Sequence, residues 1–173
     1  EIVKMTPVVW ELDKRKKEYV FIHSGQHYDY NMSEVFFKEL NLRKPDFFLE
    51  VASASHAEQT GRIMTGIEKV VKEAGITTLV VEGDTNTVLG SAIAGKKLGC
   101  KIVHVESGAR SFDKTMPEEI NRILTDHVSD VLFAPTTFCK DNLENEGLKE
   151  NIIVTGNTEL ETLDFAIEKQ KKP

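Results

Sequence analysis

Acidic side chains stand at points of the sequence from which they could meet in one place. Asp84 comes shortly after the apolar run 79–81, Glu106 directly follows the run 102–105, and Glu118 opens a later amphipathic stretch. Carboxylates brought close together raise the pKa of at least one of them. One protonated acid beside one ionised base suits reactions that move protons on carbon and oxygen, so these three residues are candidate catalytic groups.

Each of these acids also has an ordinary structural interpretation. Asp84 precedes a predicted helix, where Asp is a favoured N-cap. Glu118 stands three residues after a threonine, which is the spacing of a capping box. Glu106 leaves a buried strand and needs a partner there, and Arg110 or Arg122 could supply an ion pair. Spacing alone leaves both interpretations open.

The elements that must position these acids alternate between short apolar runs and longer amphipathic stretches. The runs predict strands at 19–23, 47–51, 78–81, 102–105, 131–133 and 152–155. The stretches predict helices at 6–16, 33–40, 56–74, 85–98, 117–128, 136–146 and 158–170. This alternation indicates an α/β fold with a three-layer, doubly wound parallel sheet of the Rossmann-like type. Ligands of such sheets bind beyond the carboxyl ends of the strands.

Several helix boundaries carry local signals. Thr6 and Pro7 predict the start of the first helix, with the threonine as cap and the proline at the first helical position. Ser55 and Glu58 have capping-box spacing, and Gly75 predicts the end of the same helix. The helix that begins at 117 places four apolar residues on one face, which are Ile120, Ile123, Leu124 and Val128.

Composition narrows the class of protein. The 173 residues suit one domain, and a net charge of −6 argues against non-specific nucleic-acid binding. No apolar stretch is long enough to span a bilayer. Cys100 and Cys139 lie outside any CxxC motif, which favours reduced thiols in a cytoplasmic protein. The motifs HExxH, GxGxxG, GxxxxGK[ST] and GxSxG are missing from the sequence, so we expect no metal and no cofactor.

Six short segments occur in an order and spacing that are specific when taken together. They are EIVKMTPV (1–8), SGQHYDYNM (24–32), EGDTNTVL (82–89), HVESGARSFDKTMPEEINR (104–122), LFAPT (132–136) and VTGNT (154–158). On these segments the sequence resembles the non-hydrolysing UDP-N-acetylglucosamine (UDP-GlcNAc) 2-epimerase family along nearly its whole length. The form of the fourth segment is similar to the archaeal and polysaccharide-pathway branch of that family.

The resemblance implies an isomerase with two Rossmann-like domains in the GT-B arrangement. UDP-GlcNAc would lie in the cleft between them and become UDP-N-acetylmannosamine (UDP-ManNAc), by elimination of UDP to 2-acetamidoglucal and re-addition, without a redox cofactor. Residues 1–173 would form the N-terminal domain, lacking the family's first strand, its Gly-Thr-Arg-Pro loop and the C-terminal domain. We therefore expect the isolated chain to be inactive, and the full protein to be a homodimer.

The resemblance also implies roles for individual residues. The family's catalytic carboxylates match Asp84, Glu106 and Glu118, with the last two as acid and base and the first as their electrostatic partner or proton shuttle. The family's first-loop lysine matches Lys4, a point charge for phosphate. The substrate contacts that we predict are Lys4, Gln26, His27, Gly83, Thr85, Arg110 and Arg122.

The sequence is compatible with more than one mode of regulation and more than one reaction. Some bacterial relatives bind a second UDP-GlcNAc as an activator, but Glu58 stands before Gln59 where we expect a basic residue in those relatives. A relative acting on a modified UDP-sugar, or a hydrolysing 2-epimerase, is a close alternative function. A GT-B glycosyltransferase would not need three clustered carboxylates. A non-catalytic binding or assembly fragment is the alternative outside the enzymes.

Overall fold

The computed structural model describes residues 1–25 and 30–171, in which helices and strands alternate along the chain. The helices are α1 (Ile2–Lys14), α2 (Tyr30–Glu39), α3 (His56–Ala74), α4 (Asn86–Lys97), α5 (Pro117–Val128), α6 (Thr137–Asn145) and α7 (Glu159–Gln170). The strands are β1 (Ile22–His23), β2 (Phe47–Phe48), β3 (Thr78–Glu82), β4 (Lys101–Val105), β5 (Val131–Ala134) and β6 (Ile152–Val154). The predicted order of elements is confirmed, and most boundaries differ by a few residues.

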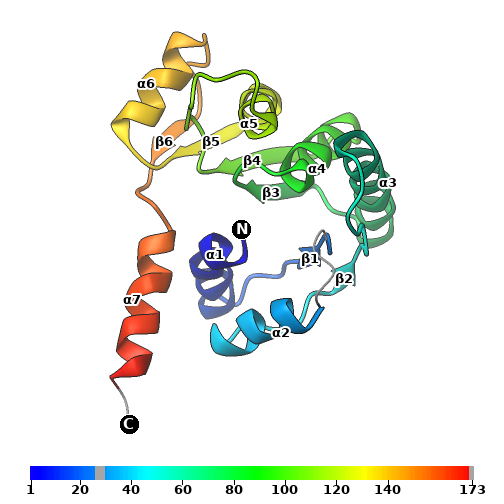
Figure 1. Ribbon diagram of the computed structural model, residues 1–173, viewed down its shortest axis with the longest axis vertical. Coiled ribbons are helices and arrows are strands. Elements are labelled where there is room, and N and C mark those ends of the chain that lie inside the picture. The colour runs from blue at the N-terminus through cyan, green and yellow to red at the C-terminus, as the bar shows by residue number, and fades with distance from the viewer. Residues whose placement is uncertain (26–29, 172–173) are drawn as a thin grey trace.

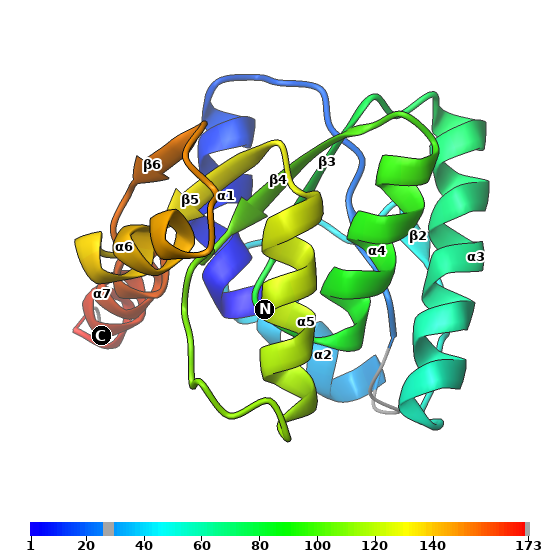
Figure 2. The ribbon, with the colours of Figure 1, turned by 90° about the horizontal axis from the view of Figure 1, so that it is seen from above.

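The strands form two parallel sheets. Four of them hydrogen-bond in the order β3-β4-β5-β6, and β1 pairs with β2 in a separate two-stranded sheet. Figures 1 and 2 show α4 and α5 on one side of the larger sheet and α1 on the other. The α/β, Rossmann-like fold is therefore confirmed. Within the described residues β1 and β3 each pair on one edge only, so the sheet is interrupted between them.

The core lies between the larger sheet and the helices on one of its faces. Its buried apolar residues include Ile63 and Ile67 of α3, Leu79 of β3, Ala92 of α4 and Ile102 of β4. As predicted, Ser55 caps α3 by accepting a hydrogen bond from the backbone N–H of the residue three places later, and a left-handed glycine ends the helix. No helix within the described residues is long and apolar enough to cross a membrane.

The start of α1 differs from the prediction. The helix begins at Ile2, so Pro7 lies inside it instead of at its first position. Proline has no backbone N–H, which leaves the carbonyl four residues earlier, that of Val3, without its helical donor. The hydroxyl of Thr162 in α7 donates to the Val3 carbonyl at 2.8 Å, and Thr162 is buried. A partner from the far end of the chain thus replaces the missing bond, and the first turn of the helix is kept.

The faces of α5 also differ from the prediction. Ile120 and Leu124 are 44% and 45% exposed, whereas Glu119 and Asp126 are 1% and 0% exposed. The helix therefore buries a polar face and leaves much of its apolar face uncovered in this chain. Burial of these carboxylates is possible because each accepts hydrogen bonds and lies beside an arginine. The apolar pattern predicted the helix correctly, and two of its four apolar residues, Ile120 and Leu124, are exposed.

The cap of α5 is a further correction. Met116 is the N-cap, with no side-chain cap bond, and Pro117 is the first helical residue. The hydroxyl of Thr115 donates to a carboxylate oxygen of Asp113 at 2.6 Å. The capping box predicted between Thr115 and Glu118 is therefore wrong, because the threonine is already engaged in its own loop.

Gly108 is a position where the fold has no room for a side chain. Its φ is +79°, and a Cβ there would lie 2.2 Å from the carbonyl oxygen of Cys139 in α6. The close approach lets Asn142 donate to the Gly108 carbonyl at 2.9 Å. The loop between β4 and α5 is thus held against α6 by backbone contact.

We expect Gly108→Ala to lower the free energy of unfolding by about 3 kcal/mol or more, because overpacking against backbone adds to the cost of a left-handed residue. Gly99→Ala is the matched control. Gly99 has φ +81° with no atom within 4 Å of the added Cβ, so only the conformational cost of about 1–2 kcal/mol applies. Urea denaturation of the two variants measures the difference, and equal losses would contradict the steric argument.

Candidate active site

The candidate acids lie where neighbouring parallel strands end. Glu82 is the last residue of β3, and Glu106 directly follows β4. The two strand ends are joined by a hydrogen bond from the backbone N–H of Gly83 to the carbonyl of Val105. Lys4 reaches the same edge from α1, and Arg122 reaches it from α5. Two strands and two helices therefore supply the charged groups of one site.

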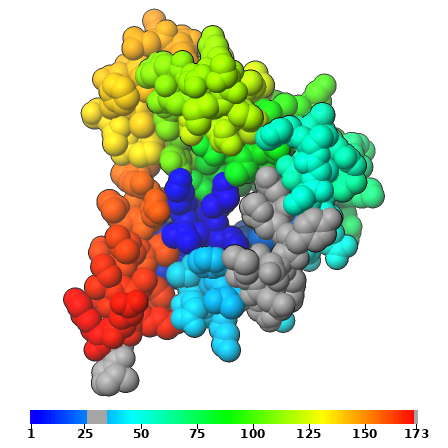
Figure 3. Space-filling model, in the orientation of Figure 1, coloured from blue at the N-terminus to red at the C-terminus, as the bar shows by residue number. Residues whose placement is uncertain are grey.

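Lys4 and Glu106 form the first ion pair of the site. The ammonium group of Lys4 donates to Oε2 of Glu106 and lies 3.8 Å from Oε1 of Glu82. Burial acts to lower the pKa of Lys4, but the hydrogen bond to Glu106 and the charges around it outweigh burial and raise that pKa. Lys4 is therefore a cation at neutral pH. Figure 3 shows the first residues of the chain, in blue, at the surface in the centre of one face.

Glu82 carries a carboxyl group whose two oxygens are buried and have no hydrogen-bond partner in the described part of the chain. Burial, and after it the neighbouring Glu106, raise the pKa of Glu82 to about 9, although the charge of Lys4 acts in the opposite direction. Burial also acts to raise the pKa of Glu106, but Glu82, Lys4 and Arg122 outweigh it and hold that pKa below its usual value. At pH 7 the site thus places a neutral acid beside an ionised one.

The backbone of Glu106 adopts a conformation that is uncommon for its residue type. Its φ is +68°, in the left-handed region that favours glycine. Such strain costs on the order of 1–2 kcal/mol and persists only where the surroundings impose it. It marks Glu106 as a residue whose position serves the site at the expense of local stability.

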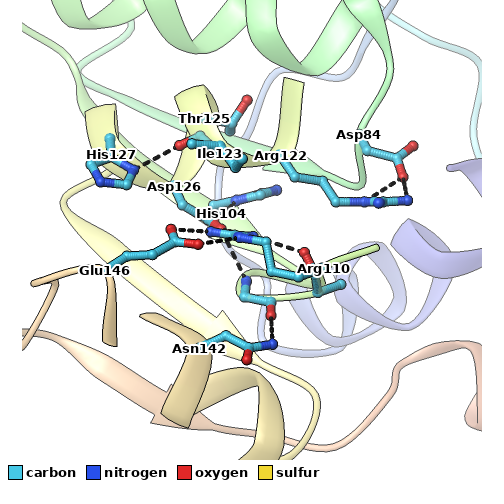
Figure 4. A network of polar contacts seen from close by, with 12 residues as sticks. Asp84, His104, Arg110, Arg122, Ile123, Thr125, Asp126, His127, Asn142 and Glu146 are labelled. Atoms are coloured by element: carbon cyan, nitrogen blue, oxygen red, sulfur yellow. Dashed lines mark hydrogen bonds and ion pairs between the residues drawn. The ribbon is translucent and has the colours of Figure 1, made fainter. Parts of the chain in front are cut away.

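Asp84 belongs to a second ion-pair chain that runs onto α5. Its Oδ2 accepts from Nε and Nη2 of Arg122 at 2.9 and 2.6 Å, as Figure 4 shows. Arg122 also donates to Glu119 at 3.0 Å, and Asn121 donates to the backbone carbonyl of Asp84 at 2.8 Å. The N-cap of α4 is Thr85, so the interpretation of Asp84 as that cap is wrong. The arginine holds the Asp84 carboxylate instead.

The three predicted catalytic acids are brought together only in part. Arg122 binds Asp84 and lowers the pKa of Glu106, so these two acids share one cation. The side chain of Glu118 is exposed in the first turn of α5 and makes no hydrogen bond or ion pair with any described residue. Its catalytic role stays a prediction. The ordinary partner predicted for Glu106 was an arginine, whereas the structure gives it Lys4.

The predicted substrate contacts fall into different surroundings. The side chain of Arg110 is 1% exposed and is paired with Asp126 and Glu146. Gly83 has φ +85° and turns the chain after β3, and the hydroxyl of Thr85 is buried without a hydrogen-bond partner among the described residues. Gln26 and His27 lie outside the described residues. The ligand contacts of all these residues stay predictions.

Sequence reasoning missed Glu82 and Glu119 as members of the site. The signal for Glu82 was an acid at the end of an otherwise apolar strand, directly before a Gly-Asp turn. The signal for Glu119 was its i, i+3 spacing to Arg122 on one helix face. Glu119 is 1% exposed and accepts from the backbone N–H groups of Ser111 and Phe112, each at 2.9 Å, which ties the preceding loop to α5.

An open groove of about 430 Å³ lies between α3 and the first turns of α4 and α5. Its walls are largely apolar, and none of the acids of the site lines it. We place the chemistry at the strand ends because the perturbed carboxyl groups are there. The described residues contain no group of three or more His, Cys, Asp or Glu side chains that could hold a metal ion.

The chain is similar to known proteins both in sequence and in structure. The family model described as UDP-N-acetylglucosamine 2-epimerase matches residues 10–173. The chain belongs to this family. A UDP-N-acetylglucosamine 2-epimerase of Methanococcus maripaludis is 52% identical over 159 residues, which cover 91% of this chain and 43% of that protein. The chain thus spans less than half the length of this curated relative.

Two other members of the family are informative. The crystal structure of Methanocaldococcus jannaschii UDP-GlcNAc 2-epimerase in complex with UDP-GlcNAc and UDP matches with a TM-score of 0.97 and 46% identity, covering 100% of this chain and 48% of that one. A UDP-2,3-diacetamido-2,3-dideoxy-D-glucuronate 2-epimerase of Pseudomonas aeruginosa is 49% identical over 130 residues, covering 75% of this chain and 37% of that protein. The family therefore includes enzymes named for different UDP-sugars.

The Glu82 carboxyl makes stability depend on pH in a direction that can be tested. Its pKa is about 9 in the folded chain against the ordinary value of 4.5, so the folded state holds a proton that the unfolded state releases between these pH values. Stability from this group is full below about pH 4.5 and falls as pH rises towards 9. We expect Glu82→Gln to gain stability relative to the unaltered chain over this range, by a few kcal/mol.

Glu106→Gln is the comparison variant, because the pKa of Glu106 is shifted the other way. Its carboxylate contributes stability that is present above the unfolded pKa and is lost as pH falls. The free energy of unfolding of the unaltered chain should therefore increase relative to that of Glu106→Gln as pH rises through the acid range. Urea denaturation at a series of pH values measures both variants, and a Glu82→Gln difference that stays flat from pH 5 to 9 would refute the neutral acid.

Proposed function

We propose that this chain provides the first-domain half of the active site of an enzyme that interconverts UDP-GlcNAc and UDP-ManNAc. The observation that carries the proposal is the carboxylate of Glu106 at the strand ends, which is paired with Lys4 and lies beside the buried carboxyl group of Glu82. Epimerisation at C2 requires that a proton leave one face of the sugar and that a proton return to the other. A carboxylate that a neighbouring cation holds ionised is suited to take up and return such a proton.

The proposed reaction proceeds by elimination and re-addition. A base takes the proton from C2, the bond between C1 and the UDP oxygen breaks, and the electron pair forms the C1=C2 double bond of 2-acetamidoglucal. In the return step UDP adds to C1 and a proton reaches C2 from the opposite face. We assign acid and base roles to Glu106 and Glu118 and the electrostatic partner or shuttle role to Asp84. Lys4 offers positive charge for the leaving diphosphate or for a carboxylate next to it.

The remaining parts of the proposal concern the rest of the enzyme. We propose that residues 1–173 act as the N-terminal domain of a two-domain protein, with a second domain contributing the other wall of the nucleotide-sugar cleft. We also propose a cytoplasmic protein, which the two unpaired cysteines favour. A homodimer is a further proposal, supported by the exposed apolar residues Met116, Ile120 and Leu124 along α5. Light scattering of the purified protein measures the association state.

A second candidate substrate has its own support. The Pseudomonas relative is named for a UDP-2,3-diacetamido uronic acid sugar and is nearly as similar over its matched segment as the Methanococcus relative. A hydrolysing enzyme would release free N-acetylmannosamine instead of UDP-ManNAc. NMR analysis of the products from each UDP-sugar separates these possibilities.

A chimera tests the proposed function directly. In the Methanocaldococcus relative, the segment that matches this chain is replaced by residues 1–171, while the relative's own preceding and following segments are kept. We expect the chimera to convert UDP-GlcNAc to UDP-ManNAc, and to place deuterium at C2 when the reaction runs in D2O. This chain alone should show no turnover, because the relatives are more than twice as long.

Within the chimera, Glu106→Gln should lower kcat by about 100-fold or more, the usual contribution of a general acid or base. Glu144→Gln is the matched control, since Glu144 is 43% exposed on α6 and is paired with Lys140, away from the site. It should leave kcat unchanged. A folded chimera without epimerisation would sink the proposed function, and full activity in Glu106→Gln would remove Glu106 from the mechanism.

A further inference from the structure

His104 is a buried histidine that the proposed mechanism does not use. It lies in β4, its side chain is 0% exposed, and both of its ring nitrogens face oxygen atoms. Nδ1 is 2.6 Å from Oδ1 of Asp126, and Nε2 is 2.9 Å from the backbone carbonyl oxygen of Gly83. Figure 4 shows His104 beside Asp126, within the network that includes Arg110 and Glu146.

The two partners determine which nitrogens carry hydrogen. A backbone carbonyl can only accept a hydrogen bond, so Nε2 must donate to Gly83. The second oxygen of Asp126 accepts from the backbone N–H of Gly108 at 3.1 Å and pairs with Arg110 at 2.8 Å, which is the pattern of an ionised carboxylate. Nδ1 therefore also donates. A ring that donates from both nitrogens is an imidazolium.

Charge balance in the interior supports the same assignment. Arg110 bridges Asp126 and Glu146, with two hydrogen bonds of 2.7 Å to Glu146, the C-cap residue of α6. Arg110, Asp126 and His104 are each at most 1% exposed at the side chain. With His104 charged, two cations face two anions. With His104 neutral, the network would hold an uncompensated negative charge, which is costly in a buried site.

We propose that His104 is a positioning residue whose ring donates from both nitrogens, to Asp126 and to the carbonyl of Gly83, and thereby holds the Gly83–Asp84 turn in place. This inference rests on the proposed function, in which Asp84 takes part in catalysis. The carbonyl of Gly83 is held by His104, and the next carbonyl, that of Asp84, is held by Asn121. The two peptide groups on either side of the Asp84 Cα are therefore each held by one hydrogen bond, and the Asp84 side chain is presented to Arg122 in one orientation.

The protonation of His104 can be measured in the unaltered chain. With 15N-labelled histidine, NMR should show both ring nitrogens of His104 protonated at pH 7, without an unprotonated, pyridine-like nitrogen. Such a nitrogen in His104 of the folded chain would overturn the assignment. This result is independent of catalysis, since epimerisation by the chimera tests the proposed function separately.

Asp126→Asn tests what keeps the ring charged. An asparagine amide can donate to Nδ1, so we expect the ring to lose its Nδ1 proton and to keep the Nε2–H bond to Gly83. The Nδ1 resonance should shift to the unprotonated range, and exchange of the Gly83 amide should stay within about twofold. A ring that remains doubly protonated in this variant would contradict the role of the Asp126 charge.

His104→Gln tests the positioning role, because glutamine cannot donate to both partners along the same directions. The Gly83 amide donates to the carbonyl of Val105, and we expect its hydrogen exchange to quicken by about tenfold, the effect of losing one supporting hydrogen bond. His127→Gln, at the exposed end of α5, is the control and should leave this amide unchanged. An unchanged Gly83 amide in a folded His104→Gln chain would overturn the proposal. If that variant does not fold, the nitrogen spectra above decide it.

Discussion

The arrangement of the site follows from one electrostatic constraint, which is that carboxyl groups at the ends of adjacent parallel strands must be balanced or neutralised. Glu82, Asp84 and Glu106 are crowded at one sheet edge. The cations come from outside it, Lys4 from α1 and Arg122 from α5. Glu82 is buried deepest of the three and is neutralised by a proton. Both helices are therefore part of the site as much as the strands are.

Much of the fold could be predicted from the sequence, because short apolar runs and capped amphipathic stretches are local signals. The strand ends could be predicted for the same reason, and so could the positions of Asp84 and Glu106. The protonation state of Glu82 could not, because it depends on burial by segments distant in sequence. Local signals also could not separate Glu118 from Glu119, two identical neighbours of which one is exposed and one is buried.

The orientation of α5 shows where periodicity alone was misleading. An amphipathic pattern assumes that apolar residues face the core, but the core beside α5 already contains Arg110 and His104 and requires carboxylate partners. The polar face of the helix turned inward supplies them through Asp126, and Arg122 on the same helix reaches the strand ends. The face of α5 that is buried is the one that supplies carboxylate partners to these interior groups. The apolar residues left outside are then available to another surface.

The contact between Thr162 and the carbonyl of Val3 joins the last helix of the chain to the first. Pro7 leaves that carbonyl without a donor inside α1. The hydroxyl of Thr162 in α7 therefore stabilises the turn of α1 that contains Lys4. Trp10 and Phe165, whose ring centroids are 4.7 Å apart, brace the same two helices one step further along. The position of Lys4 beside Glu106 therefore depends on the packing of α7 against α1, two helices from opposite ends of the sequence.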